Sequence, residues 1–287
     1  MLVFGRLITA MVTPFTEQLE VDYEKVMSLV DHLIQQGNDG IVVAGTTGES
    51  PTLTKQEKIK LFETVVSHAN GRLKIIAGTG SNNTKDSIEL SQAAEKIGVD
   101  GVMLVVPYYN KPSQEGLYLH FKAIAESVKL PVMLYNVPGR TSMNMVADTV
   151  IELSKIKNIC CIKEASGDLG QINKIIINTD SNFIVYSGDD SNTLPILAIG
   201  GYGVVSVAGH IVGKEIKAMI NSFVSGKTNE ALEIHQKLSP IFDGMFIASN
   251  PVPVKTSLNL KFLNVGNVRP PLVKANEQQI KFLEKLL

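Results

Sequence analysis

Several features that mark specialised proteins are scarce in this chain of 287 residues. It has two cysteines, too few for the disulfide framework of a small secreted domain. Its 27 basic and 28 acidic side chains give a net charge of −1, without the basic excess of a nucleic-acid-binding protein. Apolar residues make up 44% of the chain and charged residues 19%, whereas disordered chains have few apolar and many charged residues. We therefore expect a globular protein with no nucleic-acid partner.

Signals for export and for membrane insertion are also missing. The N-terminal stretch carries Arg6 among its apolar residues and Pro14 soon after, which does not match a secretory signal. The uncharged segment Ser191–Gly213 is as long as a membrane helix, but Pro195 and five glycines favour a short helix, a turn and a buried strand. We expect a cytoplasmic protein with no membrane partner.

The two cysteines, Cys160 and Cys161, are adjacent in an apolar run. Neighbouring residues of a strand point to opposite faces, which is a poor geometry for a disulfide between them. We therefore expect two small buried side chains in a reducing compartment.

Short apolar runs rich in β-branched residues recur about once every 28 residues, which fits one strand, one helix and two loops. Eight runs have this character: Leu7–Phe15, Gly40–Gly45, Lys74–Gly80, Gly101–Pro107, Pro131–Val137, Asn158–Glu164, Phe183–Asp189 and Gly203–Gly209. Helical patterns lie between them, as in Asp22–Gln36, closed by Gly37, and after the capping-box pair Thr54 and Glu57. This α/β alternation predicts parallel pairing, and eight units suit a closed (β/α)8 TIM barrel.

The residues after Gly226 do not continue the barrel pattern. Helical patterns at Ala231–Leu238, Lys255–Phe262 and Glu277–Leu287 are separated by prolines. We predict a (β/α)8 catalytic barrel over residues 1–225 and a small C-terminal helical domain over residues 226–287, which we expect to serve assembly.

Catalysis in such a barrel occurs at the carboxyl ends of the strands. Lys163 directly follows the apolar run of the sixth strand and so emerges from the barrel core. A lysine with an ordinary pKa near 10.4 is neutral in only about one molecule in a thousand at neutral pH, whereas burial lowers a lysine pKa by up to about 3–5 units. Lys163 is therefore a candidate nucleophile toward a ketone. An ion pair with Glu164 or Glu49 is the alternative interpretation.

Phenolic and cationic side chains follow neighbouring strands. Tyr135 ends the fifth strand, about 4.8 Å from the sixth, and is placed to move protons together with Thr46 and Tyr109. A structural role for Tyr135 is the alternative. Arg140 lies in the turn beyond the same strand, where its planar fork suits a substrate carboxylate or, alternatively, a surface ion pair.

Other chemistries have weak support in the sequence. The five histidines are widely separated, so we predict no metal site. The Gly78–Gly80 segment is followed by Asn83 where a dinucleotide fingerprint needs glycine, and Gly45–Ser50 lacks the Gly-Lys-Ser/Thr ending of a phosphate loop. A covalent Schiff base on lysine needs no cofactor, and we expect none.

Seven motifs stand in order along the chain: GTTGES at Gly45–Ser50, AGTGSN at Ala77–Asn82, PYYNKPSQEGLYLHF at Pro107–Phe121, YNVPGRT at Tyr135–Thr141, IKEASGD at Ile162–Asp168, SGDD at Ser187–Asp190 and NPVPVK at Asn250–Lys255. Together they resemble the dihydrodipicolinate synthase family, also called 4-hydroxy-tetrahydrodipicolinate synthase. The resemblance implies a barrel lyase that condenses pyruvate with L-aspartate 4-semialdehyde in the diaminopimelate route to lysine. It also implies a homotetramer built as a dimer of dimers, or a homodimer.

The resemblance further implies roles for single residues. The implied catalytic residues form the Schiff base and the proton relay: Lys163, Tyr135, Thr46 and Tyr109. The implied substrate-binding residues hold carboxylates and line the pyruvate pocket: Thr47, Arg140, Gly188 and Val205. Lys163 would carry the Schiff base, and Tyr109 would reach the neighbouring subunit's site. Thr47 would bind the carboxylate of pyruvate, and Arg140 that of the semialdehyde.

Members inhibited by lysine hold it at the dimer interface with a Ser-Ala pair, two histidines, an asparagine, a glutamate and a tyrosine. The matching positions in this sequence are Ser50, Pro51, Lys55, Lys58, Asn82, Asp86 and Tyr108. Two ammonium groups in place of two imidazoles would repel a cationic ligand. We therefore predict weak or absent inhibition by lysine.

Three alternative functions remain open from the sequence. Another pyruvate-linked class I aldolase, such as N-acetylneuraminate lyase or a 2-keto-3-deoxy sugar acid aldolase, would keep the lysine and tyrosine but lack the YNVPGR motif. A catalytically inactive keto-acid-binding barrel is disfavoured by the intact set of candidate catalytic residues. A phosphate-binding barrel would use the glycine-rich loop after the eighth strand.

Overall fold

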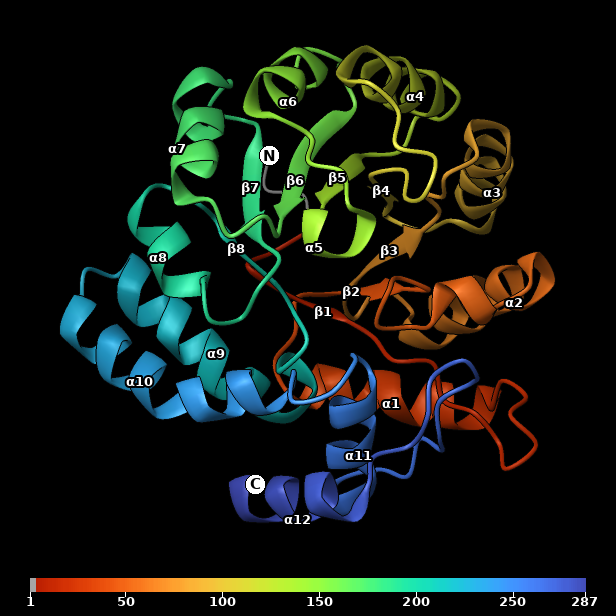
Figure 1. The fold of residues 1–287 in the computed structure, drawn as a ribbon, viewed down its shortest axis with the longest axis vertical. Coiled ribbons are helices and arrows are strands. Elements are labelled where there is room, and N and C mark those ends of the chain that lie inside the picture. Colours follow the sequence, from red (N-terminus) through yellow and green to blue (C-terminus); the bar gives the residue numbers. More distant parts are fainter. Residues whose placement is uncertain (1–3) are drawn as a thin grey trace.

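Eight parallel strands close into a barrel in the computed structural model, which describes residues 4–287 (Figure 1). The strands are β1 (Leu7–Ala10), β2 (Gly40–Val43), β3 (Lys74–Gly78), β4 (Gly101–Val105), β5 (Val132–Asn136), β6 (Ile159–Glu164), β7 (Ile184–Ser187) and β8 (Gly203–Ser206). They pair in chain order, and β8 closes the barrel against β1. The predicted (β/α)8 barrel is confirmed. Most strands end earlier than predicted because the chain leaves the sheet to form the loops that carry the candidate site.

Helices follow the strands and surround the barrel. They are α1 (Tyr23–Gln35), α2 (Lys55–Ala69), α3 (Thr84–Ile97), α4 (Gln114–Glu126), α5 (Pro138–Thr141), α6 (Ala147–Leu153), α7 (Leu169–Asn178), α8 (Thr193–Ala198), α9 (Gly209–Val224), α10 (Thr228–Gly244), α11 (Val252–Lys261) and α12 (Glu277–Leu286), with a 3₁₀ turn η1 (Ser50–Thr52). The predicted capping box of Thr54 and Glu57 opens α2. Gly37 has a φ of 80° just after α1, the left-handed conformation that glycine adopts without strain.

The uncharged segment Ser191–Gly213 forms the short helix α8, a turn and the buried strand β8, as predicted. Within residues 4–287, no helix is both long and apolar enough to cross a membrane.

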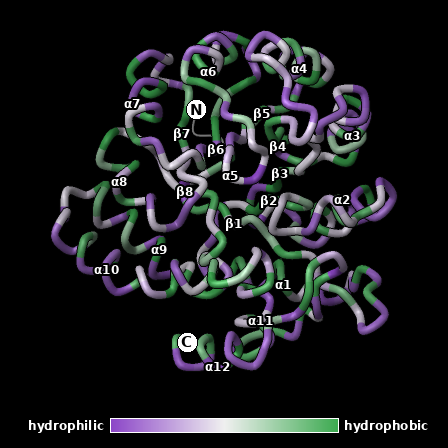
Figure 2. Tube along the Cα trace, in the orientation of Figure 1, coloured by the Kyte–Doolittle hydropathy of each residue, from purple (hydrophilic) through white to green (hydrophobic). Residues whose placement is uncertain are grey.

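The strands divide the core into two apolar clusters, because alternate residues of a strand face opposite sides. One cluster fills the barrel and includes Ile8, Val42 and Tyr186. The larger one lies between the strands and the helices and includes Leu7 and Val43. Figure 2 shows hydrophobic strands at the centre and hydrophilic residues recurring along the outer helices. The barrel is thus a packed scaffold, and a site can form only where the loops leave it.

Strand β6 departs from regular pairing beside the two cysteines. Val132 pairs with Ile159 and Met133 with Cys161, so Cys160 is an extra residue at a bulge. The two Sγ atoms lie 3.6 Å apart, and both thiols are free. The prediction that they point to opposite faces is wrong, because the bulge interrupts the alternation on which it relied.

The C-terminal helices lie on one side of the barrel, where α10 packs along α9 and α12 packs against α11 (Figure 1). Each predicted C-terminal helix overlaps one of them. Helix α10 is longer than predicted and continues through Pro240, since buried Leu238 and Phe242 hold the helix on both sides of the proline. The division of the chain at residue 225 stays a prediction.

Candidate active site

Lys163 and Tyr135 are neighbours at the carboxyl ends of β6 and β5. The two residues are direct partners in the strand register, and Lys163 is 5% exposed. The Nζ atom of Lys163 lies 4.3 Å from the centre of the Tyr135 ring. The alternation along β6 turns Lys163 toward the barrel interior and its neighbour Glu164 away from it.

Neither carboxylate considered as an alternative partner of Lys163 is available to it. Glu49 pairs with Lys255. Glu164 accepts hydrogen bonds from Asn136 and Gln171 side chains and from the backbone N–H of Ser166, and burial raises its pKa. Within residues 4–287, the amine of Lys163 forms no ion pair, so it is placed to meet a ligand.

Lys163 lines a cavity of about 140 Å³. The cavity is lined by residues from most loops at this end of the barrel: Thr46, Thr47, Tyr135, Val137, Arg140, Lys163, Ala165, Gly188, Asp189, Val207, Phe246 and Asn250. Gly188 approaches the lysine closely, since a Cβ there would lie 3.1 Å from Lys163 Cε and 2.7 Å from Ala165 Cβ. Glycine is therefore needed at this position for the lysine side chain to lie as it does.

The loop after β2 brings Thr46 and Thr47 to the cavity. Thr47 is buried, and its Oγ1 accepts a hydrogen bond of 2.8 Å from Asn250 Nδ2. Its hydroxyl hydrogen is consequently free to be donated to a ligand carboxylate.

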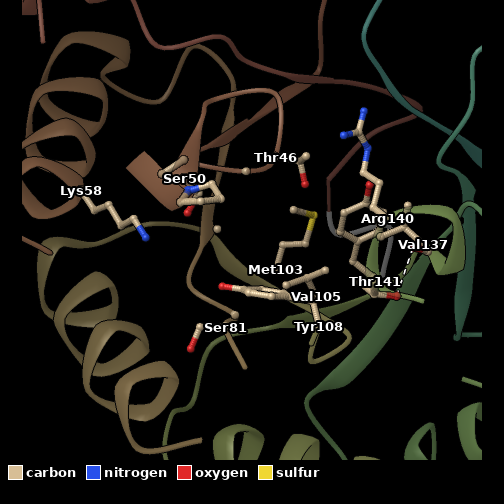
Figure 3. A pocket seen from close by; sticks show the side chains of 16 residues that line it. Thr46, Ser50, Lys58, Ser81, Met103, Val105, Tyr108, Val137, Arg140 and Thr141 are labelled. Carbon is tan, nitrogen blue, oxygen red and sulfur yellow. Dashed lines mark hydrogen bonds between the residues drawn. The ribbon is translucent and has the colours of Figure 1, made fainter. Parts of the chain in front are cut away.

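A second cavity, of about 270 Å³, adjoins the first and shares Thr46, Tyr135, Val137 and Arg140 with it. Arg140 lies on the exposed short helix α5, and it forms no ion pair with any residue that the structure describes. The surface-ion-pair alternative for this arginine therefore has no support. Figure 3 shows Lys58 reaching into the second cavity from α2 and Arg140 standing on its other side.

Two residues implied by the family resemblance do not line either cavity. Tyr109 is 90% exposed, so its side chain lies in solvent and not in a cavity of its own chain. Val205 is fully buried in the cluster that fills the barrel, and Val207 lines the cavity in its vicinity.

The positions matched to lysine inhibition are only partly brought together. Ser50, Pro51, Lys58 and Tyr108 line the second cavity, and burial lowers the pKa of Lys58. Lys55 instead pairs with Glu89 at 2.6 Å on the exposed face. Asn82 donates to the backbone oxygen of Tyr108, and Asp86 is exposed on α3, outside the lining of this cavity.

Sequence reasoning missed several residues of the Lys163 cavity. Asn250 comes from the C-terminal region and reaches the cavity through its contact with Thr47. Its motif NPVPVK was visible in the sequence, but strand-end reasoning assigns a role only to residues that follow barrel strands. Phe246 and Val207 carry no polar group that could have marked them. Within residues 4–287, no group of three His, Cys, Asp or Glu side chains could hold a metal ion.

A buried lysine against a tyrosine ring, in a cavity at the carboxyl end of a (β/α)8 barrel, places this protein in the class of Schiff-base lyases and aldolases. Residues 3–287 match the dihydrodipicolinate synthetase family, and the chain belongs to that family.

Individual relatives agree with this placement. The chain is 60% identical to the 4-hydroxy-tetrahydrodipicolinate synthase of Bacillus velezensis over 275 residues, which are 96% of this chain and 95% of the relative. It superposes on the dihydrodipicolinate synthase of Bacillus anthracis with a TM-score of 0.98 at 52% identity, covering 100% of this chain and 98% of the other. It superposes on the chloride-inhibited dihydrodipicolinate synthase of Acinetobacter baumannii, solved with pyruvate, with a TM-score of 0.95 at 39% identity, covering 99% of this chain and 97% of the other. These likenesses favour the synthase over the aldolase, binding-protein and phosphate-barrel alternatives.

Proposed function

We propose that Lys163 is the Schiff-base residue in the condensation of pyruvate with L-aspartate 4-semialdehyde to 4-hydroxy-tetrahydrodipicolinate, the reaction of this family. The observation that carries the assignment is the buried amine of Lys163, which has no ion pair within residues 4–287 and lies beside the Tyr135 ring in a small cavity. A keto acid of three carbons fits a small cavity in which an amine, a threonine hydroxyl and an arginine are present.

The chemistry follows from the properties of the amine. Lys163 attacks the ketone carbon of pyruvate, and loss of water from the carbinolamine gives an iminium ion. The iminium withdraws electrons, so the methyl group loses a proton and becomes an enamine nucleophile. The enamine attacks the aldehyde carbon of the second substrate. The amino group of that substrate then displaces Lys163 from the former ketone carbon, closing the ring and freeing the enzyme without any added cofactor.

The neighbouring side chains have separate parts in this sequence. Tyr135, whose ring centre lies 4.3 Å from the amine, transfers protons as the carbinolamine forms and collapses, and Thr46, which lines both cavities, continues the relay. Thr47 donates its hydroxyl to the carboxylate of pyruvate. Arg140 binds the carboxylate of the semialdehyde where the two cavities meet. Gly188 makes room for the lysine, and Val205 supports the cavity from the barrel core.

Tyr109 completes the relay only between two copies of the chain. Its ring is exposed and lies outside its own cavities, while the second cavity remains open beside Thr46 and Tyr135. A homodimer in which this tyrosine enters the partner's second cavity supplies the missing link to solvent. A homotetramer would then be a pair of such dimers.

Borohydride reduction in the presence of pyruvate tests the assignment. Reduction of the iminium should add the pyruvate skeleton to one peptide, and mass mapping should place it on Lys163. Lys163→Arg keeps the positive charge and should give no adduct. An adduct on any other lysine, or none on the native protein, would rule out the mechanism.

Arg140→Ala separates the two substrates. We expect the KM for the semialdehyde to rise by about 10- to 100-fold, because one charge-assisted carboxylate contact is lost, while trapping with pyruvate changes little. Steady-state kinetics and borohydride trapping on the same preparation provide the comparison. Equal losses in both measurements would mean that Arg140 does not select the semialdehyde.

A further inference from the structure

A buried ion pair joins the loop after β2 to the C-terminal helices. Glu49 Oε1 and Lys255 Nζ lie 2.7 Å apart, and their side chains are 1% and 2% exposed. In every other ion pair within residues 4–287, both side chains are at least 15% exposed. Burying both charges is costly unless each finds further partners, so this pair calls for a specific explanation.

The surroundings of Glu49 fix its backbone as well as its side chain. Its second carboxylate oxygen accepts a hydrogen bond of 2.8 Å from the backbone N–H of Arg269. Glu49 itself has a φ of 56°, a left-handed conformation that is unfavourable for residues other than glycine. On its other side, the backbone oxygen of Gly48 accepts from Thr13 Oγ1 at 2.7 Å. The loop is thus held in a conformation that it would not favour by itself.

Lys255 is equally constrained from the C-terminal side. Its Nζ donates to the backbone oxygen of Asn267 at 2.9 Å and lies 4.1 Å from the centre of the Phe15 ring. The Arg269 guanidinium contacts the same ring at 4.5 Å. Burial lowers the pKa of Lys255 to about 8, while Glu49 acts in the opposite direction. The charged pair is therefore tied to this particular packing.

A second contact joins the same two segments closer to the cavity. Asn250 Nδ2 donates to Thr47 Oγ1 at 2.8 Å. Asn250 stands five residues before Lys255, and Thr47 stands two residues before Glu49. The loop that presents Thr46 and Thr47 is therefore attached to the C-terminal region through both Thr47 and Glu49.

We propose that Glu49 and Lys255 are positioning residues for pyruvate: their ion pair holds the loop after β2 so that Thr46 and Thr47 face the amine of Lys163. The C-terminal helices then contribute to substrate binding within one subunit, in addition to the part in assembly predicted from the sequence. The inference rests on the proposed role of Thr47 in binding the carboxylate of pyruvate.

The test compares the substitutions Lys255→Met and Glu49→Gln with a matched control. Met keeps the length of the lysine stem, and Gln keeps the shape of Glu49 and an oxygen for the Arg269 N–H. The control is Lys74→Met, which removes an ion pair with Asp100 whose side chains are 52% and 30% exposed, at the start of β3. Pyruvate affinity is measured as the half-saturating concentration for borohydride trapping, and circular dichroism confirms that each variant is folded.

We expect the half-saturating pyruvate concentration to rise at least about fivefold in both test variants and to stay within about twofold of wild type in the control. The KM for the semialdehyde should change by less than about twofold, because Arg140 lies on α5 and not on the attached loop. A purely structural loss would reduce the amount of active enzyme and leave both half-saturation values unchanged.

Two results would overturn the proposal: unchanged pyruvate affinity in folded Glu49→Gln, or equal increases for both substrates. Glu49→Gln, the milder change, decides the question if Lys255→Met does not fold. Thr47→Val tests the underlying assignment separately. If Thr47→Val weakens pyruvate binding while Glu49→Gln does not, the ion pair has no positioning role. If Thr47→Val has no effect, the assigned role of Thr47 is wrong, and so is the positioning role that acts through it.

Discussion

The close approach of Gly188 to Lys163 leads to a quantitative prediction for Gly188→Ala. The added Cβ would lie 2.7 Å from Ala165 Cβ and 3.1 Å from Lys163 Cε. Optimal carbon contacts are about 3.5–4.0 Å, so Ala165 Cβ must move by roughly 1 Å and Lys163 Cε by roughly 0.4–0.9 Å. Overpacking of this kind costs about 1–3 kcal/mol of folding free energy. Displacing a reacting group by about 1 Å costs about 100-fold in rate.

We therefore expect Gly188→Ala to fold, to lose about 1–3 kcal/mol in urea unfolding, and to form the pyruvate adduct about 10- to 100-fold more slowly, because Lys163 moves by less than 1 Å. The matched control is Gly139→Ala, at the same end of the barrel, where an added Cβ would meet no atom within 4 Å. This control should keep its stability and its trapping rate. If Gly188→Ala traps pyruvate at the wild-type rate, Lys163 can move aside without cost, and the close contact does not set the position of the amine.

Two further predictions concern a cation and pH. Lysine below millimolar concentration should not inhibit the enzyme in a coupled assay, because the ammonium group of Lys58 points into the cavity that Ser50 and Tyr108, two other positions matched to lysine inhibition, also line; clear inhibition would contradict this. His210 is fully buried, and burial lowers its pKa to about 4. In the unfolded chain the His210 imidazole binds a proton near pH 6.5, whereas in the folded protein it does so only near pH 4. Buried neutral His210 therefore stabilises the fold fully above pH 6.5, and the free energy of unfolding falls by about 2–3 kcal/mol by pH 4.5. Urea unfolding above pH 6.5 and at pH 4.5 measures this loss of stability. If His210→Asn loses as much stability on acidification as wild type does, other groups cause the loss.

The fold was predictable because its pattern is strong and repeated. Strands buried on both faces appear as short apolar runs, and eight of them at regular spacing leave few topologies. Two details lay beyond this reasoning. The bulge at Cys160 changes the face of a single residue without altering composition. Helix α10 continues through Pro240 because tertiary burial outweighs the local preference.

The site was predictable where its residues follow strands, as Lys163 and Tyr135 do, since the barrel brings strand ends together. It was not predictable where residues arrive from far along the chain. Asn250 contacts Thr47 across 203 positions, and no local pattern encodes that distance. The same limit explains why Glu49 looked like a partner for Lys163. Its true partner, Lys255, lies in a segment that periodicity assigned only to a helix.

The net charge of −1 also bears on how two substrates that each carry a carboxylate are attracted. A protein without an excess of positive charge does not steer anions over long distances, and salt screens exposed charges beyond about 8 Å. Attraction must therefore arise inside the cavities. The described lining of the larger cavity includes Lys58 and Arg140 but no acidic side chain, and that of the smaller one has Lys163 and Arg140 against Asp189. The low-dielectric walls strengthen these few charges at short range. The same local field that favours the carboxylates of the two substrates opposes the net positive charge of a lysine ligand, so substrate binding and the predicted lack of lysine inhibition have one electrostatic cause.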